Sequence, residues 1–326
     1  MRAIQMSVFG EADVLKCVDL PVPEPGPGEV RIRLHAAGIN PADTYIRSGT
    51  YAFFKPKLPW TPGFDGAGIV DAAGTGDIRA KPGDRVFVAA LLARRNTGTY
   101  AEMLVCDAEA VHPLPESMSF AQGAAIGVPS ITAYRALFQR AHLQPGEIVL
   151  VHGASGGVGT ITVQLARACG ARVIGTAGTP DGLDLVRCMG AHSAVDHSKP
   201  NYRDQVLALA DGRGVDVIVE MLANVNLEKD FQALAKYGRI VIVGSRGSLE
   251  FTPRLAMMKE ADVLGMAVWN TTQQEYVSAL SAVAAALESG VLRPIVGREL
   301  PLEHAAQAHV DILKEKAQGK MVLAID

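Results

Sequence analysis

From residue 147 onward, short apolar stretches alternate with amphipathic ones, and this alternation limits the fold more than any other feature. The apolar stretches lie at 147–153, 171–178, 193–197, 215–222, 239–245 and 262–269. Between them, segments such as 157–170 and 226–238 carry apolar residues at helical spacing. Six strands joined by helical crossovers predict a parallel, doubly wound sheet of the Rossmann type.

The first 120 or so residues have a different pattern, with short strands broken by turns. The stretches at 29–39, 66–74, 83–90, 98–106 and 110–115 are typical of strands bounded by Gly and Pro. This spacing predicts a β-rich barrel.

Helical spacing begins near residue 120, where Ser119 is placed to cap a helix over 119–141. The tail has amphipathic segments at 272–290 and 302–316 and a strand at 320–325. Because the tail does not continue the strand–helix alternation, we expect it to return to the first domain. The chain is predicted to fold as an α/β protein with one domain over 1–122 and 271–326 and an inserted Rossmann domain over 123–270.

Composition agrees with two apolar cores and excludes several classes of protein. Of the 326 residues, 48% are hydrophobic and 20% charged, and the net charge is −3. That charge disfavours a nucleic-acid partner. The four cysteines are scattered, and the chain lacks both a C-x-x-C pair and a long apolar run at its start. We expect a cytoplasmic protein that does not span a membrane.

The turn after the first Rossmann strand reads ASGGVG over residues 154–159. It follows the A-x-G-x-x-G form of a dinucleotide fingerprint, with Ala154 in the first position. Gly156 lets the backbone approach a pyrophosphate, and Gly159 lets the helix pack closely on the strand. The N-terminus of the following helix offers free N–H groups to phosphates. The sequence therefore predicts a dinucleotide site.

The end of the second Rossmann strand indicates which dinucleotide binds. NAD sites usually place an Asp or Glu there, against the ribose 2′-hydroxyl. This chain has Thr176, Ala177 and Gly178, and its first acidic residue is Asp181. Since no carboxylate repels a 2′-phosphate, NADPH is favoured over NADH. The sequence offers His197 and Arg246 as candidate partners for that phosphate.

Several motifs, in this order along nearly the whole chain, carry a resemblance to a known family. They are NPADTYIRSGTY, AAIGVPSITAYRAL, VHGASGGVG, GTAGT, EMLANVN, VGSRG and GKMVL. The chain resembles the medium-chain dehydrogenase/reductase superfamily and, within it, the zinc-independent, zeta-crystallin-like quinone oxidoreductases. The resemblance implies a GroES-like barrel with an inserted Rossmann domain, and NADPH-dependent reduction of quinones, including ortho-quinones.

Zinc-dependent alcohol dehydrogenases of this superfamily hold a catalytic zinc through a Cys, a Gly-His-Glu segment and a second Cys. Here the first position is Asn40, and the Gly-His-Glu segment contains Phe64 and Asp65 instead. The stretch 90–102, where the structural zinc lobe lies in those enzymes, contains no cysteine. Because zinc needs three or four N, S or O ligands, we expect no metal site.

Without a Lewis acid, the acceptor must take hydride readily, and a quinone does so because reduction restores aromaticity. The resemblance implies that Asn40, Tyr45 and Thr132 lie beside the nicotinamide and that Tyr51 contacts the substrate. Tyr45 is a candidate proton donor, although a phenol with a pKa near 10 can hydrogen-bond without transferring its proton. The alternative is that Tyr45 is a packed aromatic contact of the cofactor.

The resemblance also extends to NADPH contacts at the carboxyl ends of the predicted strands. It assigns the pyrophosphate to the glycine turn, the adenosine half to the second to fourth strands, and the remainder to the loops after the fifth and sixth. These residues are Ser155, Gly156, Gly157, Val158, Gly178, His197, Asn226, Val243, Gly244, Ser245, Arg246, Met266, Ala267 and Val268.

The sixth strand, 262–269, is an apolar sheet edge without Pro or Lys. We expect it to pair with a second copy, giving a homodimer or homotetramer. Two other functions remain open: reduction of enals, enones or enoyl thioesters by NADPH, and a crystallin-like structural role or binding of AU-rich RNA. The second has little support, since the chain has no run of basic and aromatic residues.

Overall fold

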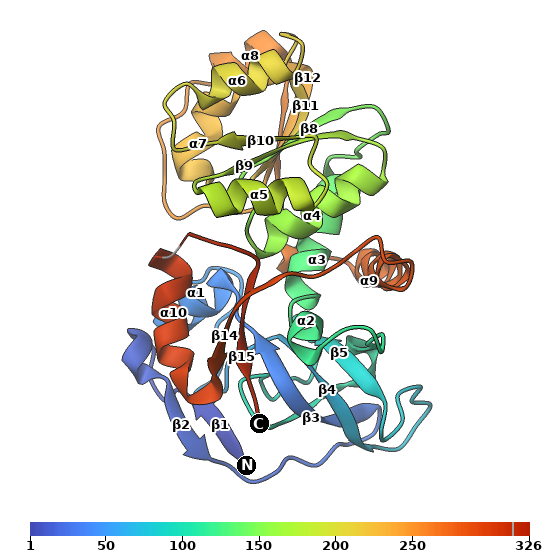
Figure 1. Cartoon of the computed structure of the whole chain (residues 1–326). Helices are drawn as coiled ribbons and strands as arrows, with labels where there is room; N and C mark the ends of the chain where they lie inside the picture. The colour runs from blue at the N-terminus through green and yellow to red at the C-terminus, as the bar shows by residue number, and fades with distance from the viewer. Residues whose placement is uncertain (315) are drawn as a thin grey trace. The chain divides into compact units, whose positions relative to one another are not determined.

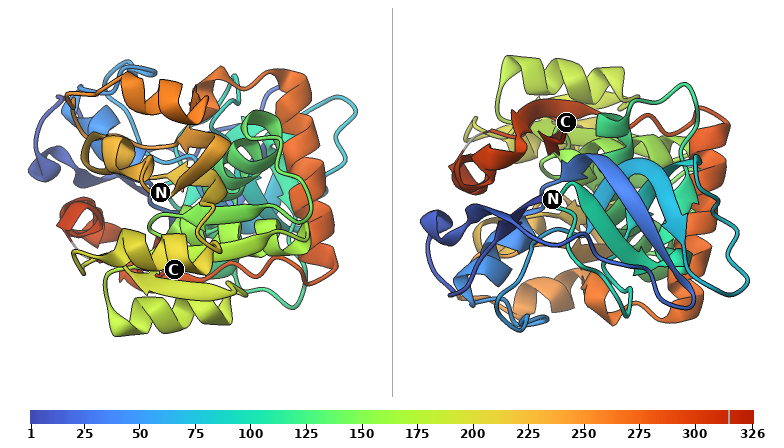
Figure 2. Two further views of the ribbon diagram at one scale, coloured as in Figure 1. Left: turned by 90° about the horizontal axis from the view of Figure 1, so that it is seen from above. Right: turned by 90° about the horizontal axis from the view of Figure 1, so that it is seen from below.

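The computed structural model describes residues 1–314 and 316–326, which form two compact units. Unit 1 comprises Met1–Val128, Pro294–Glu315 and Gly319–Asp326, and unit 2 comprises Pro129–Arg293 and Lys316–Gln318. Both chain ends, marked N and C, belong to unit 1 (Figures 1 and 2).

Unit 2 contains a parallel sheet of six strands in the order β10-β9-β8-β11-β12-β13. This confirms the predicted Rossmann arrangement, in which strand order reverses beside the first strand. The strands are rich in Val and Ile, whose side chains point to both faces of the sheet, so both faces are apolar. Ile148, Ile174, Ile218 and Ile240 belong to the core that packs there. The strands are β8 (Ile148–Val151), β9 (Arg172–Ala177), β10 (Ser193–Asp196), β11 (Val215–Glu220), β12 (Leu234–Ile242) and β13 (Asp262–Gly265).

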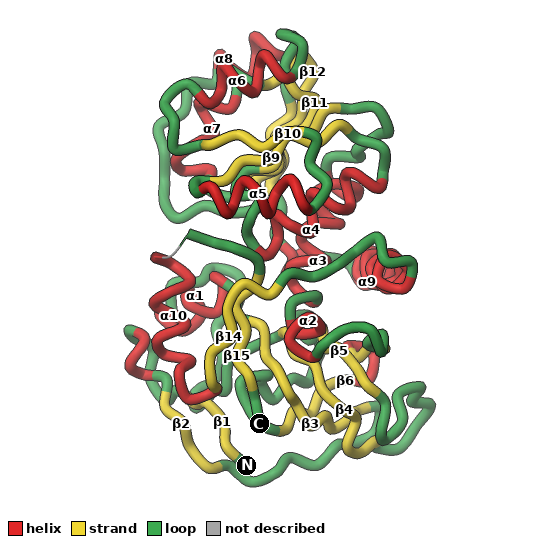
Figure 3. The backbone as a smooth tube through the Cα atoms, in the orientation of Figure 1, coloured by secondary structure: helices red, strands yellow, loops and turns green. Residues whose placement is uncertain are grey.

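Helices cover both faces of this sheet, as expected when the connections between its parallel strands are all right-handed crossovers. In Figure 3, α4 and α5 lie on one side of the sheet and α6 and α8 on the other. The helices are α4 (Gly157–Ala168), α5 (Pro180–Cys188), α6 (Tyr202–Leu209), α7 (Ala223–Asp230) and α8 (Arg254–Lys259).

One crossover helix is shorter than the sequence pattern predicts. The segment 226–238 was expected to be helical throughout, but α7 ends at Asp230 and β12 begins at Leu234. The β11–β12 pairing shifts register between Val215 and Val217, and Tyr237 takes a left-handed φ of 64°. The strand therefore starts earlier than predicted and is irregular near Tyr237. Its pairing with β11 is a tertiary contact that helical periodicity does not reveal.

Unit 1 is built on a curved seven-stranded sheet in the order β14-β15-β3-β4-β5-β7, with β6 pairing β3. A separate hairpin joins β1 to β2. Inward-facing side chains such as Ile32, Val88, Leu104 and Leu323 form its core. The strands are β1 (Arg2–Gln5), β2 (Lys16–Asp19), β3 (Glu29–Gly38), β4 (Asp65–Ala73), β5 (Arg85–Ala89), β6 (Met103–Asp107), β7 (Val111–Pro113), β14 (Val296–Pro301) and β15 (Lys320–Ala324).

The helical stretch predicted over 119–141 is broken into three pieces. Ser119 caps the first piece as predicted, because its Oγ accepts a hydrogen bond of 3.2 Å from the backbone N–H of Gln122. The pieces are α2 (Phe120–Ala124), α3 (Gly127–Tyr134) and a π-helix, η3 (Arg135–Arg140). The remaining helices are α1 (Pro41–Ser48), α9 (Gln273–Glu288), α10 (Ala305–Lys314) and the 3₁₀ turns η1 (Ala12–Val14), η2 (Ala108–Ala110), η4 (Val268–Asn270) and η5 (Leu302–His304).

The tail does not return to the first unit at residue 271, where the sequence placed the boundary. Helix α9 belongs to unit 2, and the chain re-enters unit 1 at Pro294. The physical reason is an ion pair of 2.7 Å between Arg135 and Glu275, together with a hydrogen bond of 2.8 Å from Gln139 to the Glu275 carbonyl. These contacts hold α9 against η3.

The last helix was expected over 302–316. It runs from Ala305 to Lys314, and Glu315 lies outside the described residues. Among the residues that the structure describes, no helix has the length and apolar character needed to cross a membrane.

Candidate functional site

The glycine turn connects β8 to α4 and has the geometry of a phosphate-binding loop. Gly153 carries the positive φ of 56°, so Ala154 does not need one. Ala154 is fully buried and donates its N–H to the Thr176 carbonyl. A Cβ on Gly159 would lie 2.3 Å from the Gly153 carbonyl oxygen. Only glycine therefore fits at Gly159, whereas alanine at 154 is part of the packing.

The residues predicted to bind the pyrophosphate lie together at the start of α4. Gly156 is the N-cap, and Gly157 and Val158 begin a helix of 12 residues. Their N–H groups carry the positive end of the helix dipole. Ser155 is nearly buried, and its Oγ donates a hydrogen bond of 2.8 Å to the carbonyl of Ala317. The arrangement suits a dianionic diphosphate.

At the end of β9, the structure brings together residues that are distant in sequence. A Cβ on Gly178 would lie 2.8 Å from Nε2 of His197, and His197 Nδ1 lies 3.2 Å from Thr176 Oγ1. Burial, and then the charge of His152, lower the pKa of His197. The exposed Lys316 donates a hydrogen bond of 2.9 Å to the Gly178 carbonyl. Lys316 thus provides a cation that the sequence analysis missed.

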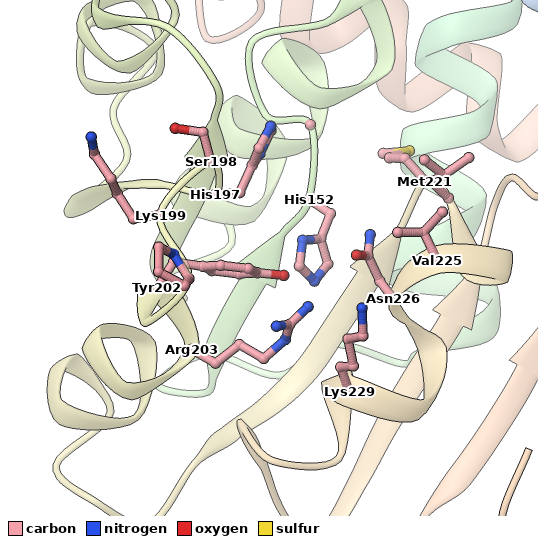
Figure 4. Close-up of a pocket in the computed structure, with 13 residues that line it drawn as sticks. His152, His197, Ser198, Lys199, Tyr202, Arg203, Met221, Val225, Asn226 and Lys229 are labelled. Carbon is pink, nitrogen blue, oxygen red and sulfur yellow. The ribbon is translucent and has the colours of Figure 1, made fainter.

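A pocket of about 440 Å³ opens beside these residues, within the usual size range of ligand sites. In the view of Figure 4, Tyr202 lies on one side of His152 and Asn226 on the other. Lys199, Arg203 and Lys229 also line the pocket and make its surroundings positively charged. The predicted contacts His197 and Asn226 therefore share one cavity, which further comprises Gly153, Ser198, Pro200, Met221, Leu222 and Val225.

Behind the pocket, His152 contacts two buried carboxylates that the sequence analysis did not identify. Its Nε2 lies 2.9 Å from Asp230 Oδ1 and 3.4 Å from Glu220 Oε2. Glu220 Oε1 in turn accepts a hydrogen bond of 3.2 Å from the Asn226 side-chain amide. Burial raises the pKa of Glu220 and of Asp230 to about 7 and lowers that of His152. The cluster orients Asn226 toward the pocket.

Among residues 1–314 and 316–326, these three residues form the one group of potential metal ligands whose ligand atoms lie close enough together to hold an ion. The ligand atoms of His152, Glu220 and Asp230 all lie within 4.8 Å of one another. The cluster already has a hydrogen bond between His152 and Asp230, and the positive charge of Arg203 acts on both groups. We therefore treat it as a hydrogen-bonded support for the pocket.

The loops after β12 and β13 lie at the same edge of the sheet. Val243 N donates to the Glu220 carbonyl, and Met266 N donates to the Ile242 carbonyl. A Cβ on Gly244 would lie 2.4 Å from the Met221 carbonyl oxygen. Ser245 and Arg246 follow in this loop, where Arg246 N donates to Asn224 Oδ1, while Ala267 and Val268 follow Met266.

Unit 1 holds the other predicted residues, Asn40, Tyr45 and Tyr51, whereas Thr132 lies on α3 within unit 2. Asn40 immediately precedes α1, which contains Tyr45. The rings of Tyr45 and Tyr51 are nearly parallel, with centroids 6.4 Å apart, and Phe53 meets Tyr51 edge-on at 5.4 Å. Phe53 is half exposed. These rings form a partly exposed aromatic surface.

The positions that correspond to zinc ligands in the superfamily form a buried polar cluster. Asn40 Nδ2 donates a hydrogen bond of 2.9 Å to Asp65 Oδ2, and Lys320 Nζ lies 3.2 Å from the same oxygen. Lys320 Nζ also donates to Asn40 Oδ1. Phe64 is buried and has no metal-ligating atom. Sequence reasoning missed Lys320, although it stands in the quoted GKMVL motif.

A second buried chain of hydrogen bonds lies beside this cluster. Asp43 Oδ2 accepts from Asn40 N at 2.8 Å and from the Tyr100 hydroxyl at 3.0 Å, and that hydroxyl lies 3.2 Å from His309 Nε2. Burial raises the pKa of Asp43 to about 7 and lowers that of His309 to about 3. These groups hold α1, and with it Asn40, in place.

Comparisons with known proteins agree with this geometry. The family model described as alcohol dehydrogenase GroES-like domain matches residues 26–116, and the family model described as zinc-binding dehydrogenase matches residues 157–285. The quinone oxidoreductase of Homo sapiens is 46% identical over 100% of this chain and 98% of its own length.

The chain belongs to the quinone oxidoreductase family of the medium-chain dehydrogenase/reductase superfamily. The quinone oxidoreductase of Rattus norvegicus is 47% identical over 100% of this chain and 98% of its own length. The structure of Escherichia coli quinone oxidoreductase complexed with NADPH superposes with a TM-score of 0.87 at 29% identity, covering 100% of both chains. A structure described as an NAD-dependent alcohol dehydrogenase has a TM-score of 0.91 at 34% identity, with 100% coverage of both chains. This quinone oxidoreductase family member is an oxidoreductase with a GroES-like and a Rossmann unit.

Replacing Asp230 with Asn is expected to change how stability depends on pH. Because the folded-state pKa of Asp230 is about 7, above the unfolded value of about 3.9, its contribution to stability is present at low pH and is lost as pH rises through 7. The Asp230→Asn variant escapes this loss and should gain melting temperature relative to the wild type between pH 5 and pH 8.

The measurement is thermal unfolding across that pH range, with Glu116→Gln as the control, since Glu116 is an exposed carboxylate. The control should follow the wild type at each pH. A difference between Asp230→Asn and wild type that stays constant from pH 5 to pH 8 contradicts the assignment.

Proposed function

We propose that this oxidoreductase transfers hydride from NADPH to quinones, ortho-quinones among them, without a catalytic metal. The observation that carries the proposal is the 46–47% identity, over the whole chain, to proteins named quinone oxidoreductase. In this proposal, unit 2 binds the cofactor and unit 1 presents the acceptor.

The end of β9 supports the choice of NADPH. No carboxylate follows the strand, and Lys316 and His197 lie against Gly178. Because the pKa of His197 is lowered, the ring is a neutral hydrogen-bonding partner, and Lys316 supplies the charge for a 2′-phosphate. Arg246, the other candidate in the sequence, lies in the loop after β12.

The cofactor supplies a hydride from nicotinamide C4, and the protein residues position the reactants and exclude water. Ser155, Gly156, Gly157 and Val158 bind the diphosphate through the turn and the helix terminus, as argued above. The partly exposed rings of Tyr45, Tyr51 and Phe53 form a surface on which a flat conjugated acceptor stacks.

The buried cluster in unit 1 supports metal-free chemistry. A dication at Asn40 and Asp65 would lie next to the Lys320 ammonium, which already hydrogen-bonds both side chains. The dication and the ammonium would repel each other strongly, because like charges in contact in a buried site are poorly screened. The donor set is also poor, since an amide and one carboxylate do not make the tetrahedral N/S site that zinc prefers.

The acceptor is tested by following NADPH oxidation with ortho-quinones, para-quinones, 2-alkenals and enones, in the presence and absence of a chelator. We expect turnover of quinones, ortho-quinones included, at a rate that the chelator leaves unchanged. The metal content of the same sample is measured in parallel and should be well below one zinc per chain. Turnover of 2-alkenals alone would instead identify an enal reductase, and loss of activity with the chelator would contradict the metal-free proposal.

Replacing Lys316 with Ala is expected to weaken NADPH binding about tenfold, because a charge-assisted hydrogen bond is worth about 1.5–3 kcal/mol. NADH lacks the 2′-phosphate, so its dissociation constant should change less than twofold. Titration of nicotinamide fluorescence measures both constants. Lys314→Ala is the matched control, since Lys314 is an exposed lysine at the end of α10. An equal loss of affinity for both cofactors would contradict this role of Lys316.

We further propose that β13 pairs with its copy in a homodimer, or in a homotetramer built from such dimers. The strand is at the sheet edge, Val263 is 39% exposed, and residues 262–269 contain no Pro or Lys. A Val263→Lys substitution places a charge on this edge and should shift the mass measured by light scattering toward the monomer. Val8→Lys, at an exposed position of unit 1, should leave the mass unchanged. A monomeric wild type at micromolar concentration would contradict the proposal.

A further inference from the structure

The cluster of Asn40, Asp65 and Lys320 is built by the register of three neighbouring strands. Strand β15 pairs with β3 through Val322 and Gly38, and Gly38 in turn pairs with Asp65 on β4. Asn40 follows the end of β3, so the three side chains meet at one end of the sheet. A Cβ on Gly38 would lie 3.0 Å from both the Lys320 Cε and the Asp65 Cβ. Glycine at this position leaves room for the contact.

The two partners determine how the Asn40 amide is oriented. Its oxygen accepts from the Lys320 ammonium, and its nitrogen donates to the Asp65 carboxylate. The reverse orientation would place N–H groups against an ammonium and an oxygen against a carboxylate, so the assignment follows from the partners. Asp65 cannot turn away, because its other oxygen accepts a hydrogen bond of 2.7 Å from Val128 N.

The second N–H of the amide has no partner among the described residues. A primary amide has two N–H donors, and Asn40 Nδ2 makes one hydrogen bond, to Asp65. Asp65 is 0% exposed, whereas Asn40 keeps 5% of its surface exposed. The ammonium on the amide oxygen withdraws electron density from the nitrogen, which strengthens the remaining N–H as a donor through hydrogen-bond cooperativity.

We propose that this N–H of Asn40 binds the carbonyl oxygen of the acceptor, with Lys320 and Asp65 as positioning residues that hold and polarise the amide. The inference rests on the proposed function and goes beyond a contact with the cofactor. Tyr45 lies on the helix that Asn40 precedes, five residues after Asn40. The donor is therefore close in sequence to one of the aromatic residues proposed to stack on the acceptor.

The step balances without a proton from Asn40. Hydride forms a new bond to an electrophilic atom of the conjugated acceptor, and the displaced π electron pair moves onto the carbonyl oxygen. The Asn40 N–H stabilises the resulting oxyanion, and water then supplies the proton. A preorganised donor aimed at a developing oxyanion acts mainly in the transition state. Asn40 should therefore affect kcat more than KM.

Kinetics of Asn40→Ala give the first test. Loss of one oxyanion donor typically lowers kcat about a hundredfold or more, and we expect that loss with quinone as acceptor. The dissociation constant of NADPH should change less than threefold. A kcat within twofold of the wild type would overturn the proposal. If the wild type itself oxidises no NADPH with any quinone, the proposed function fails, and the role of Asn40 is decided by the binding test that follows.

The binding test needs no turnover. 4-Nitrophenol is titrated on the protein with NADP⁺ bound, and its phenolate absorbance reports the pKa of the bound phenol. An oxyanion donor lowers that pKa, so the bound phenol should ionise at lower pH on the wild type than on Asn40→Ala. Equal phenol pKa values on the two proteins, or no binding of the phenol to the wild type, would overturn the proposal.

Lys320 variants separate positioning from folding. Lys320→Met keeps the chain length but removes the charge, and should raise the pKa of the bound phenol and lower kcat about tenfold. Lys320→Arg restores a cation and should recover part of both effects. Lys81→Met, at an exposed position of unit 1, is the control and should match the wild type. A Lys320→Met variant with a lower melting temperature but an unchanged phenol pKa would show that Lys320 is only structural, and would overturn its positioning role.

Discussion

The parallel pairing of six strands in unit 2 is the constraint on which the cofactor site depends. Because all six strands run in one direction, the loops that follow them meet at a single edge of the sheet. The strand order reverses between β8 and β11, so the loops after these two strands leave toward opposite faces of the sheet. The pocket lined by His152, Met221 and Asn226 opens at this point. The glycine turn and the end of β9 lie beside it, so a dinucleotide can span the edge.

That edge is supported by polar groups whose burial opposes folding at neutral pH. Glu220 and Asp230 are buried against His152, and both carboxyl groups have pKa values raised to about 7. An apolar core would be more stable here, but it could not orient the Asn226 amide through Glu220. Buried networks of this kind restrict the conformations of the side chains that they contact. The pocket thus gains a fixed lining at some expense of stability.

The sequence predicted the elements of the fold better than the contacts between distant segments. Strand–helix alternation and the glycine turn are local patterns, so the six strands and the phosphate loop could be recognised from them. The placement of α9 could not, since the ion pair between Arg135 and Glu275 joins segments 140 residues apart in sequence. Lys316 was missed for the same reason, because its partner Gly178 lies 138 residues earlier in the chain. Composition and periodicity carry no information about such long-range pairs.

In the proposed metal-free chemistry, charged groups of unit 1 take the place of a metal ion. The ammonium of Lys320 reaches Asn40 and Asp65 only when β15, β3 and β4 pair in register. The polarising charge is therefore created by folding and cannot dissociate. Unlike a metal dication, an ammonium is not a Lewis acid, so in the proposed mechanism it acts through hydrogen bonds and favours an acceptor that is already electrophilic. Conjugated acceptors that form delocalised oxyanions meet this requirement, and simple ketones do not.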